Sequence, residues 1–159
     1  MEVEQRSAGE KGPDVITLPP FLYAGPLLAG LLLDRLLPLP RLPGALRLAG
    51  LPLLTGGVAL GVWFATAMTR ARTPIDVHQA PTALVETGPF ARTRNPGYLS
   101  LALDYSGIAL LAGGRWPLLF LPGVLVVVDR GVIRREEVYL ERRFGAAYRA
   151  YLYRVRRWL

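Results

Sequence analysis

The stretch Leu48–Met68 constrains this chain most, because it runs for 21 residues without a charged side chain. About 20 apolar residues in a helix span the hydrocarbon core of a bilayer. A second stretch of the same length, Leu18–Pro38, is nearly as apolar and carries only Asp34 and Arg35 near its end. Blocks of this length predict membrane-spanning helices and are not typical of a soluble core.

Two shorter apolar stretches follow, Gly97–Gly114 and Trp116–Val128. Each is short for a full span, but the Gly113-Gly114 pair is a turn signal, so together they predict a helical hairpin. Pro117 suits the first turn of its second helix. The expected fold is therefore all-α: an integral membrane helical bundle of about four transmembrane helices, followed by an amphipathic C-terminal helix.

Polar segments flank these stretches. Residues 1–17 are a mixed-charge tail without the pattern of a signal peptide, and residues 18–159 are expected to form a single membrane domain. We expect Asp129 and Arg130 to close the fourth stretch. Beyond it, apolar residues recur at helical spacing as far as Val155, which predicts the amphipathic helix, and Gly145 is expected to divide that helix into two pieces.

The charge distribution predicts an orientation. The formal net charge is +7, and the apolar stretches indicate that the positive excess faces a membrane surface and not a nucleic acid. With four spans, both termini and the loop Thr69–Asn95 lie on one side, which then holds 14 lysines and arginines against three on the other. Positive residues prefer the cytoplasmic side, so both termini are expected there. The chain has no cysteine and one histidine, which excludes thiolate and multi-histidine metal sites.

The loop before the third stretch contains two turn signals, Gly88-Pro89 and Asn95-Pro96. They bracket a short segment that enters the third helix and offers backbone donors and acceptors at the membrane surface. The residues alone leave two interpretations open, a binding loop and a plain interfacial connector.

Acidic residues provide further candidates. Glu137 falls on the apolar stripe of the last helix, where a carboxylate must pair with an arginine or contact a ligand. Together with Glu136 it also fits a simple capping role at the start of that helix. Asp104 lies within the third stretch, where an ionisable side chain costs roughly 2.5–3.5 kcal/mol, so it is either functional or a partner for Arg130 or a helix backbone. His78 is interpreted as a loop residue.

The loop and the start of the last helix each carry a motif, in a defined order and separated by the hairpin. The two motifs comprise Leu84-Val85, Gly88-Pro89-Phe90, Arg94-Asn95-Pro96 and Tyr98, then Glu136-Glu137, Leu140, Phe144-Gly145, Tyr148 and Tyr151. Together they resemble the isoprenylcysteine carboxyl methyltransferase family and the related membrane phospholipid methyltransferases. The resemblance covers about residues 73–159.

This resemblance implies a membrane enzyme that uses S-adenosyl-L-methionine on its cytoplasmic face. The family's substrate-binding arginine lies four residues before the cofactor-binding acid. Here that position is Val132, so Arg130 and Arg134 on either side become the candidate catalytic arginines. The family's usual histidine before the proline is Asn95 here. The residues carried over as cofactor-binding are Thr82, Ala83, Leu84, Val85, Phe90, Asn95, Pro96, Gly97, Tyr98, Glu136 and Glu137.

The chemistry of these residues is compatible with methyl transfer, an in-line displacement that depends on positioning. A carboxylate such as Glu136 accepts hydrogen bonds from hydroxyls or an ammonium, and an aromatic ring such as Tyr98 or Phe90 can face a sulfonium. The expected partners are the lipid bilayer and a lipophilic or prenylated acceptor, with no nucleic acid. Three alternatives stay open: a phospholipid N-methyltransferase, a non-catalytic membrane scaffold that keeps the fold, and a sterol-type reductase with a nicotinamide site.

Overall fold

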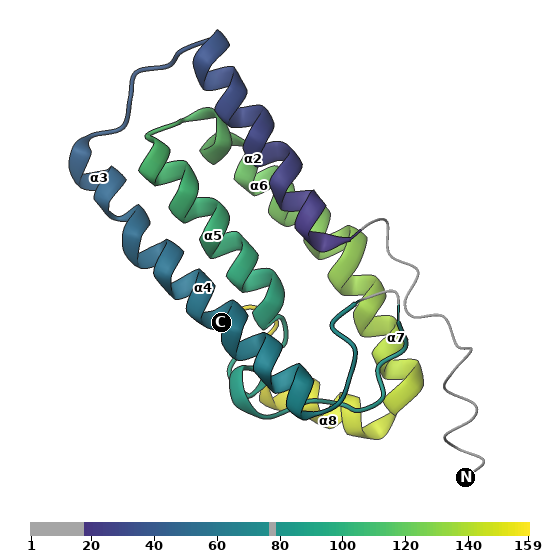
Figure 1. Ribbon diagram of the computed structural model, residues 1–159. Coiled ribbons are helices and arrows are strands. Elements are labelled where there is room, and N and C mark those ends of the chain that lie inside the picture. Colours follow the sequence, from purple (N-terminus) through teal and green to yellow (C-terminus); the bar gives the residue numbers. More distant parts are fainter. Residues whose placement is uncertain (1–17, 77–78) are drawn as a thin grey trace.

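The computed structural model describes residues 18–76 and 79–159, and within these ranges the regular elements are all helices. Four long helices lie alongside one another and alternate in direction along the chain (Figure 1). A five-residue helix, α3 (Gly44–Leu48), leads into the second of them. The four are α2 (Pro19–Leu36), α4 (Gly50–Arg70), α5 (Pro96–Ala112) and α6 (Trp116–Val128). The all-α expectation is confirmed.

The fourth helix does not end at Arg130, so that sequence prediction is wrong. A single turn of π-helix, η2 (Asp129–Ile133), joins α6 to α7 (Arg134–Phe144), and together they form one helix of 29 residues. The helix continues because this segment contains no proline, and charged side chains alone do not end a helix.

The last helix is divided where the sequence predicted it. Gly145 has a φ of +54°, which glycine adopts readily, and it separates α7 from α8 (Ala146–Arg154). The backbone is extended at Val155, so the helical part ends earlier than the sequence suggested.

The outer surface of the bundle is apolar. Two helices, Gly44–Arg70 and Trp116–Phe144, are long and apolar enough to cross a membrane. On α2, Leu28, Leu32 and Leu36 lie on successive turns of one face, and each is more than half exposed. A contiguous exposed apolar face of this kind marks a membrane or partner contact. The exposed apolar face and the two long helices therefore favour a position in a membrane.

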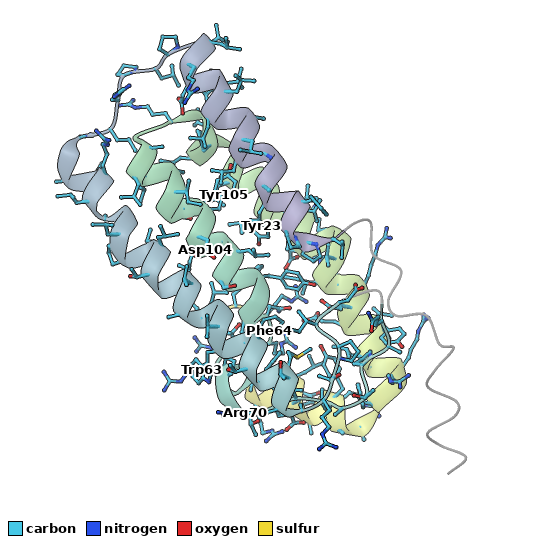
Figure 2. All side chains as sticks on the ribbon, in the orientation of Figure 1. Tyr23, Trp63, Phe64, Arg70, Asp104 and Tyr105 are labelled. Carbon is cyan, nitrogen blue, oxygen red and sulfur yellow. The ribbon has the colours of Figure 1, made fainter. Side chains whose placement is uncertain are left out.

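Close helix contacts hold the bundle together. α4 packs mainly against α5, and α2 packs against α6. A Cβ on Gly107 of α5 would lie 2.7 Å from the backbone nitrogen of Leu54 on α4, so only glycine permits this approach. The Tyr23 hydroxyl on α2 donates to the carbonyl of Tyr98 on α5, 3.1 Å away. Tyr23 also contacts the ring of Tyr105 edge-on (Figure 2).

Two acidic residues, one on α2 and one on α5, contact a neighbouring helix of the bundle. Asp34 on α2 accepts hydrogen bonds from the backbone nitrogens of Arg115 and Trp116, at 3.2 and 3.4 Å, and so caps the start of α6. Asp104 on α5 lies directly against Gly57 of α4 (Figure 2). Among the described residues, Asp104 Oδ1 is buried and has no hydrogen-bond partner.

Candidate active site

A cavity of about 650 Å³ lies at the end of the bundle where α4 ends and α5 begins. The first turn of α2, the loop before α5, α7 and α8 complete its wall. In Figure 1, α8 lies below the end of α4, at this end of the bundle. The two sequence motifs, remote along the chain, therefore line one space. The expected cofactor-binding residues among its lining are Ala83, Leu84, Val85, Phe90, Asn95, Pro96, Gly97, Tyr98, Glu136 and Glu137.

Thr82 does not line the cavity but holds the loop that forms its wall. Its hydroxyl donates to the carbonyl of Arg72 at 2.9 Å, and its backbone nitrogen donates to Thr73 Oγ1 at 3.1 Å. His78 lies outside the described residues.

The link between the two motifs is a hydrogen bond. The Tyr98 hydroxyl, in the first turns of α5, donates to Glu136 Oε2 on α7 at 2.8 Å. Gly97 lets α5 approach the end of α4, since a Cβ there would lie 3.2 Å from the ring of Phe64. The hydrogen bond from Tyr98 holds the Glu136 carboxylate at the wall of the cavity, which both residues line.

Arg94 is a lining residue to which sequence reasoning assigned no role. One of its terminal nitrogens pairs with Glu137 Oε1 at 3.3 Å, while its Nε is buried and has no hydrogen-bond partner among the described residues. An unpaired buried N–H is costly, so this atom is suited to an acceptor brought by a ligand. The sequence feature that could have indicated Arg94 is its place directly before the Asn95-Pro96 turn.

Aromatic side chains form much of the remaining wall. Phe64 and Phe90 lie with ring centroids 5.8 Å apart, and the Tyr151 hydroxyl donates to the carbonyl of Phe90 at 2.7 Å. The ring centroids of Tyr148 and Tyr151 lie 6.1 Å apart. Burial raises the pKa of both phenols above their usual range, so both stay neutral. The periodicity of the last helix indicated the two tyrosines, but nothing in the sequence indicated Phe64.

The segment Val155–Trp158, here named the closing strap, folds back over the cavity loop. The backbone nitrogen of Arg94 donates to the carbonyl of Arg156 at 3.0 Å. The Asn95 side-chain amide donates to the carbonyl of Arg157 at 2.9 Å, and the Thr93 hydroxyl donates to the same carbonyl at 3.1 Å. Asn95, where the resembled family has histidine, therefore ties the loop to the strap.

Arg157 also connects the strap to α7 and η2. Its Nε and Nη2 donate to the two carboxylate oxygens of Glu137 at 3.1 and 2.6 Å, and its Nη1 donates to Asp129 at 3.3 Å. The hydrogen bond to Glu137 raises the pKa of Arg157 above its usual value. One strap residue thus bridges the loop that carries the first motif and the helix that carries the second.

Arg130 and Arg134 do not line the cavity. They line a second hollow of about 400 Å³ that shares no lining residue with the first. Arg134 Nε donates to Asp129 at 3.2 Å, and Val132 between the two arginines is fully buried. The π-turn inserts an extra residue into the helical repeat, so spacing from Glu136 does not indicate which face these side chains occupy.

Comparison with known proteins agrees with this geometry. A family model described as phospholipid methyltransferase matches residues 46–147, which is well over half of the chain and includes both Tyr98 and Glu136. The chain belongs to the phospholipid methyltransferase family. Membership implies a membrane methyltransferase, and members of the family generally use S-adenosylmethionine.

A Haemophilus influenzae protein described as uncharacterized is similar to part of this chain. It is 42% identical over 62 residues, which cover 39% of this chain and 98% of that protein. No solved structure matches the chain.

Proposed function

We propose that this methyltransferase uses S-adenosyl-L-methionine to methylate a lipophilic acceptor that enters the cavity from the bilayer. The observation that carries the proposal is the meeting of the two motifs in one cavity, through the 2.8 Å hydrogen bond between Tyr98 and Glu136. The volume lies within the ordinary range for small-molecule sites, roughly 300–1,000 Å³.

The donor groups of the cavity suit this cofactor. When bound, S-adenosylmethionine supplies an electrophilic methyl group on a sulfonium. Glu136 can accept hydrogen bonds from its ammonium or ribose hydroxyls, and the unpaired Nε of Arg94 can donate to its carboxylate. Phe90 and Tyr98 offer aromatic faces to a sulfonium or to adenine. These residues bind and orient, which is what an in-line transfer requires.

The family match favours a lipid amine over a carboxylate as the acceptor. The family model that matches the chain is described as phospholipid methyltransferase. Arg94, the one basic side chain in the described lining, already pairs with Glu137, and its unpaired Nε suits the cofactor. The described lining therefore offers no further guanidinium to an acceptor carboxylate. We therefore place lipid N-methylation ahead of the isoprenylcysteine-like O-methylation indicated by the sequence.

A deuterated methyl group distinguishes the two acceptor classes. Purified protein, S-adenosylmethionine with a CD3 methyl, and vesicles containing phosphatidylethanolamine should yield lipid with added CD3 on nitrogen, detected by mass spectrometry. A farnesylated cysteine analogue offered in the same vesicles should stay unlabelled.

CD3 on the farnesylated carboxylate and none on the lipid amine would contradict lipid N-methylation. Methyl transfer to a lipophilic acceptor would be contradicted as a whole if no label appeared in either substrate and none appeared in a membrane lipid extract offered in their place. Protein inactivated by heating is the control for non-enzymatic methylation.

We also propose four spans with both termini in the cytoplasm, supported by the distribution of lysines and arginines along the sequence. A reporter fused after Leu159 should be active in the form that works only in the cytoplasm. Activity of the form that works only outside the cytoplasm would contradict this orientation.

A further inference from the structure

The second hollow lies between α5 and the long helix formed by α6, η2 and α7. Its lining has an apolar part and a charged part. The apolar part comes from α5, α6 and the closing strap, and the charged part comes from η2 and the start of α7. The lining residues are Leu99, Ala102, Leu125, Val126, Trp158, Asp129, Arg130 and Arg134.

The charged part of this hollow is positive and accessible. Arg130 is exposed, and its side chain forms no hydrogen bond or ion pair with the rest of the described chain. The side chain of Arg134 is 57% exposed, and Asp129 is its one partner within residues 18–76 and 79–159. Asp129 also pairs with Arg157, so its charge is compensated by two guanidiniums. An anion that approaches the hollow is therefore attracted.

The apolar part defines what kind of anion fits. Leu125 and Val126 belong to the apolar segment of the long helix, which is a candidate membrane span, and Val126 is 49% exposed. Trp158 adds an indole ring to the lining of the hollow. A soluble phosphate would leave this apolar surface uncovered, whereas an acyl chain would cover it.

We propose that the second hollow binds an anionic phospholipid from the bilayer. Its phosphate contacts Arg130 and Arg134 through charge-assisted hydrogen bonds, and an acyl chain lies along Leu125 and Val126. The site is separate from the cofactor cavity, since the two hollows share no lining residue. The proposal does not depend on methyl transfer, and it gives both arginines a role other than acceptor binding.

The ring of Trp158 provides a direct probe of this site. With Trp63→Phe and Trp116→Phe, Trp158 is the only remaining tryptophan of the chain's three. In phosphatidylcholine vesicles, a minor fraction of phosphatidylglycerol with brominated chains should quench its fluorescence more than the same fraction of brominated phosphatidylcholine. At roughly 1 kcal/mol for each arginine near an anionic surface, each guanidinium should contribute a preference of roughly fivefold.

Matched variants test the residues. Arg130→Gln together with Arg134→Gln should abolish the excess quenching, while Arg142→Gln, an exposed arginine on α7 outside the hollow, should keep it. Equal quenching by the two brominated lipids, or persistence of the excess in the double variant, would overturn the proposal. So would competition by soluble glycerol phosphate as strong as that by phosphatidylglycerol, because the ligand would then be a free phosphate.

A second measurement keeps all native tryptophans. Native mass spectrometry of the wild-type protein should show retained phosphatidylglycerol in preference to phosphatidylcholine, and Arg130→Gln with Arg134→Gln should remove that preference. Retention that is equal for the two lipids contradicts the site even if the variants with one tryptophan fold poorly.

Discussion

Replacing Glu136 by glutamine is expected to raise the Kd for S-adenosylmethionine or S-adenosylhomocysteine by roughly 10- to 100-fold. Hydrogen bonds to a charged group contribute about 1.5–3 kcal/mol each, and a tenfold change in Kd corresponds to 1.4 kcal/mol. Glutamine keeps the size of the side chain and can still accept a hydrogen bond from Tyr98. The change therefore removes the carboxylate group and keeps the packing. Isothermal titration of the purified protein in detergent measures the Kd.

Glu141→Gln is the matched control for this experiment. Glu141 lies on the same helix, outside the cavity, and its side chain is 45% exposed and pairs with Arg149. The control should bind the cofactor as the wild type does. Equal affinity in the Glu136 and Glu141 variants would show that Glu136 does not contact the cofactor.

Replacing Arg157 by alanine is expected to lower both the thermal midpoint and the cofactor affinity. The variant loses two hydrogen bonds to Glu137 and one to Asp129, and it leaves Glu137 with Arg94 as its remaining partner. For a side chain that is 31% exposed, we expect a loss of about 1.5–3 kcal/mol in the free energy of unfolding. The Kd for S-adenosylhomocysteine should rise because Glu137, which lines the cavity and pairs with Arg94, loses the side chain that holds both of its carboxylate oxygens.

Two variants distinguish positioning from plain stability. Arg157→Lys retains the charge but lacks the planar fork that contacts both oxygens of Glu137, so it should recover part of the thermal midpoint and less of the affinity. Arg156→Ala removes an exposed neighbour of the same charge and should change neither quantity. The strap has no role in cofactor binding if Arg157→Ala lowers the midpoint and leaves the Kd at the wild-type value.

The helices were the most predictable part of this protein. Long apolar blocks and the Gly113-Gly114 turn signal determine where helices start and stop, because a chain in lipid must satisfy its backbone within each segment. Gly113 ends α5 with a φ of +70°, and Gly145 divides the last helix. The two halves of the cavity were also recognisable, since each half is a local motif.

Features that depend on contacts between remote residues were not predictable. The strap reaches Asn95 and Glu137 across 62 and 20 residues, and no local pattern encodes such a return. The positions of Arg130 and Arg134 depend on the π-turn, which shifts the side-chain register in a way that helical spacing from Glu136 does not reveal. Asp104 is unusual within an apolar stretch of the sequence, but its close contact with Gly57 depends on the packing of α4 against α5.

The cavity between α5 and α7 is expected to bind S-adenosylmethionine. The most direct measurement is isothermal titration of the wild-type protein with S-adenosylhomocysteine, followed by competition with S-adenosylmethionine. We expect saturable binding of one molecule for each chain, competed by S-adenosylmethionine and unaffected by nicotinamide nucleotides. Binding of a nicotinamide nucleotide with no binding of S-adenosylhomocysteine would contradict it and favour the reductase alternative. Binding of neither ligand would favour the non-catalytic scaffold.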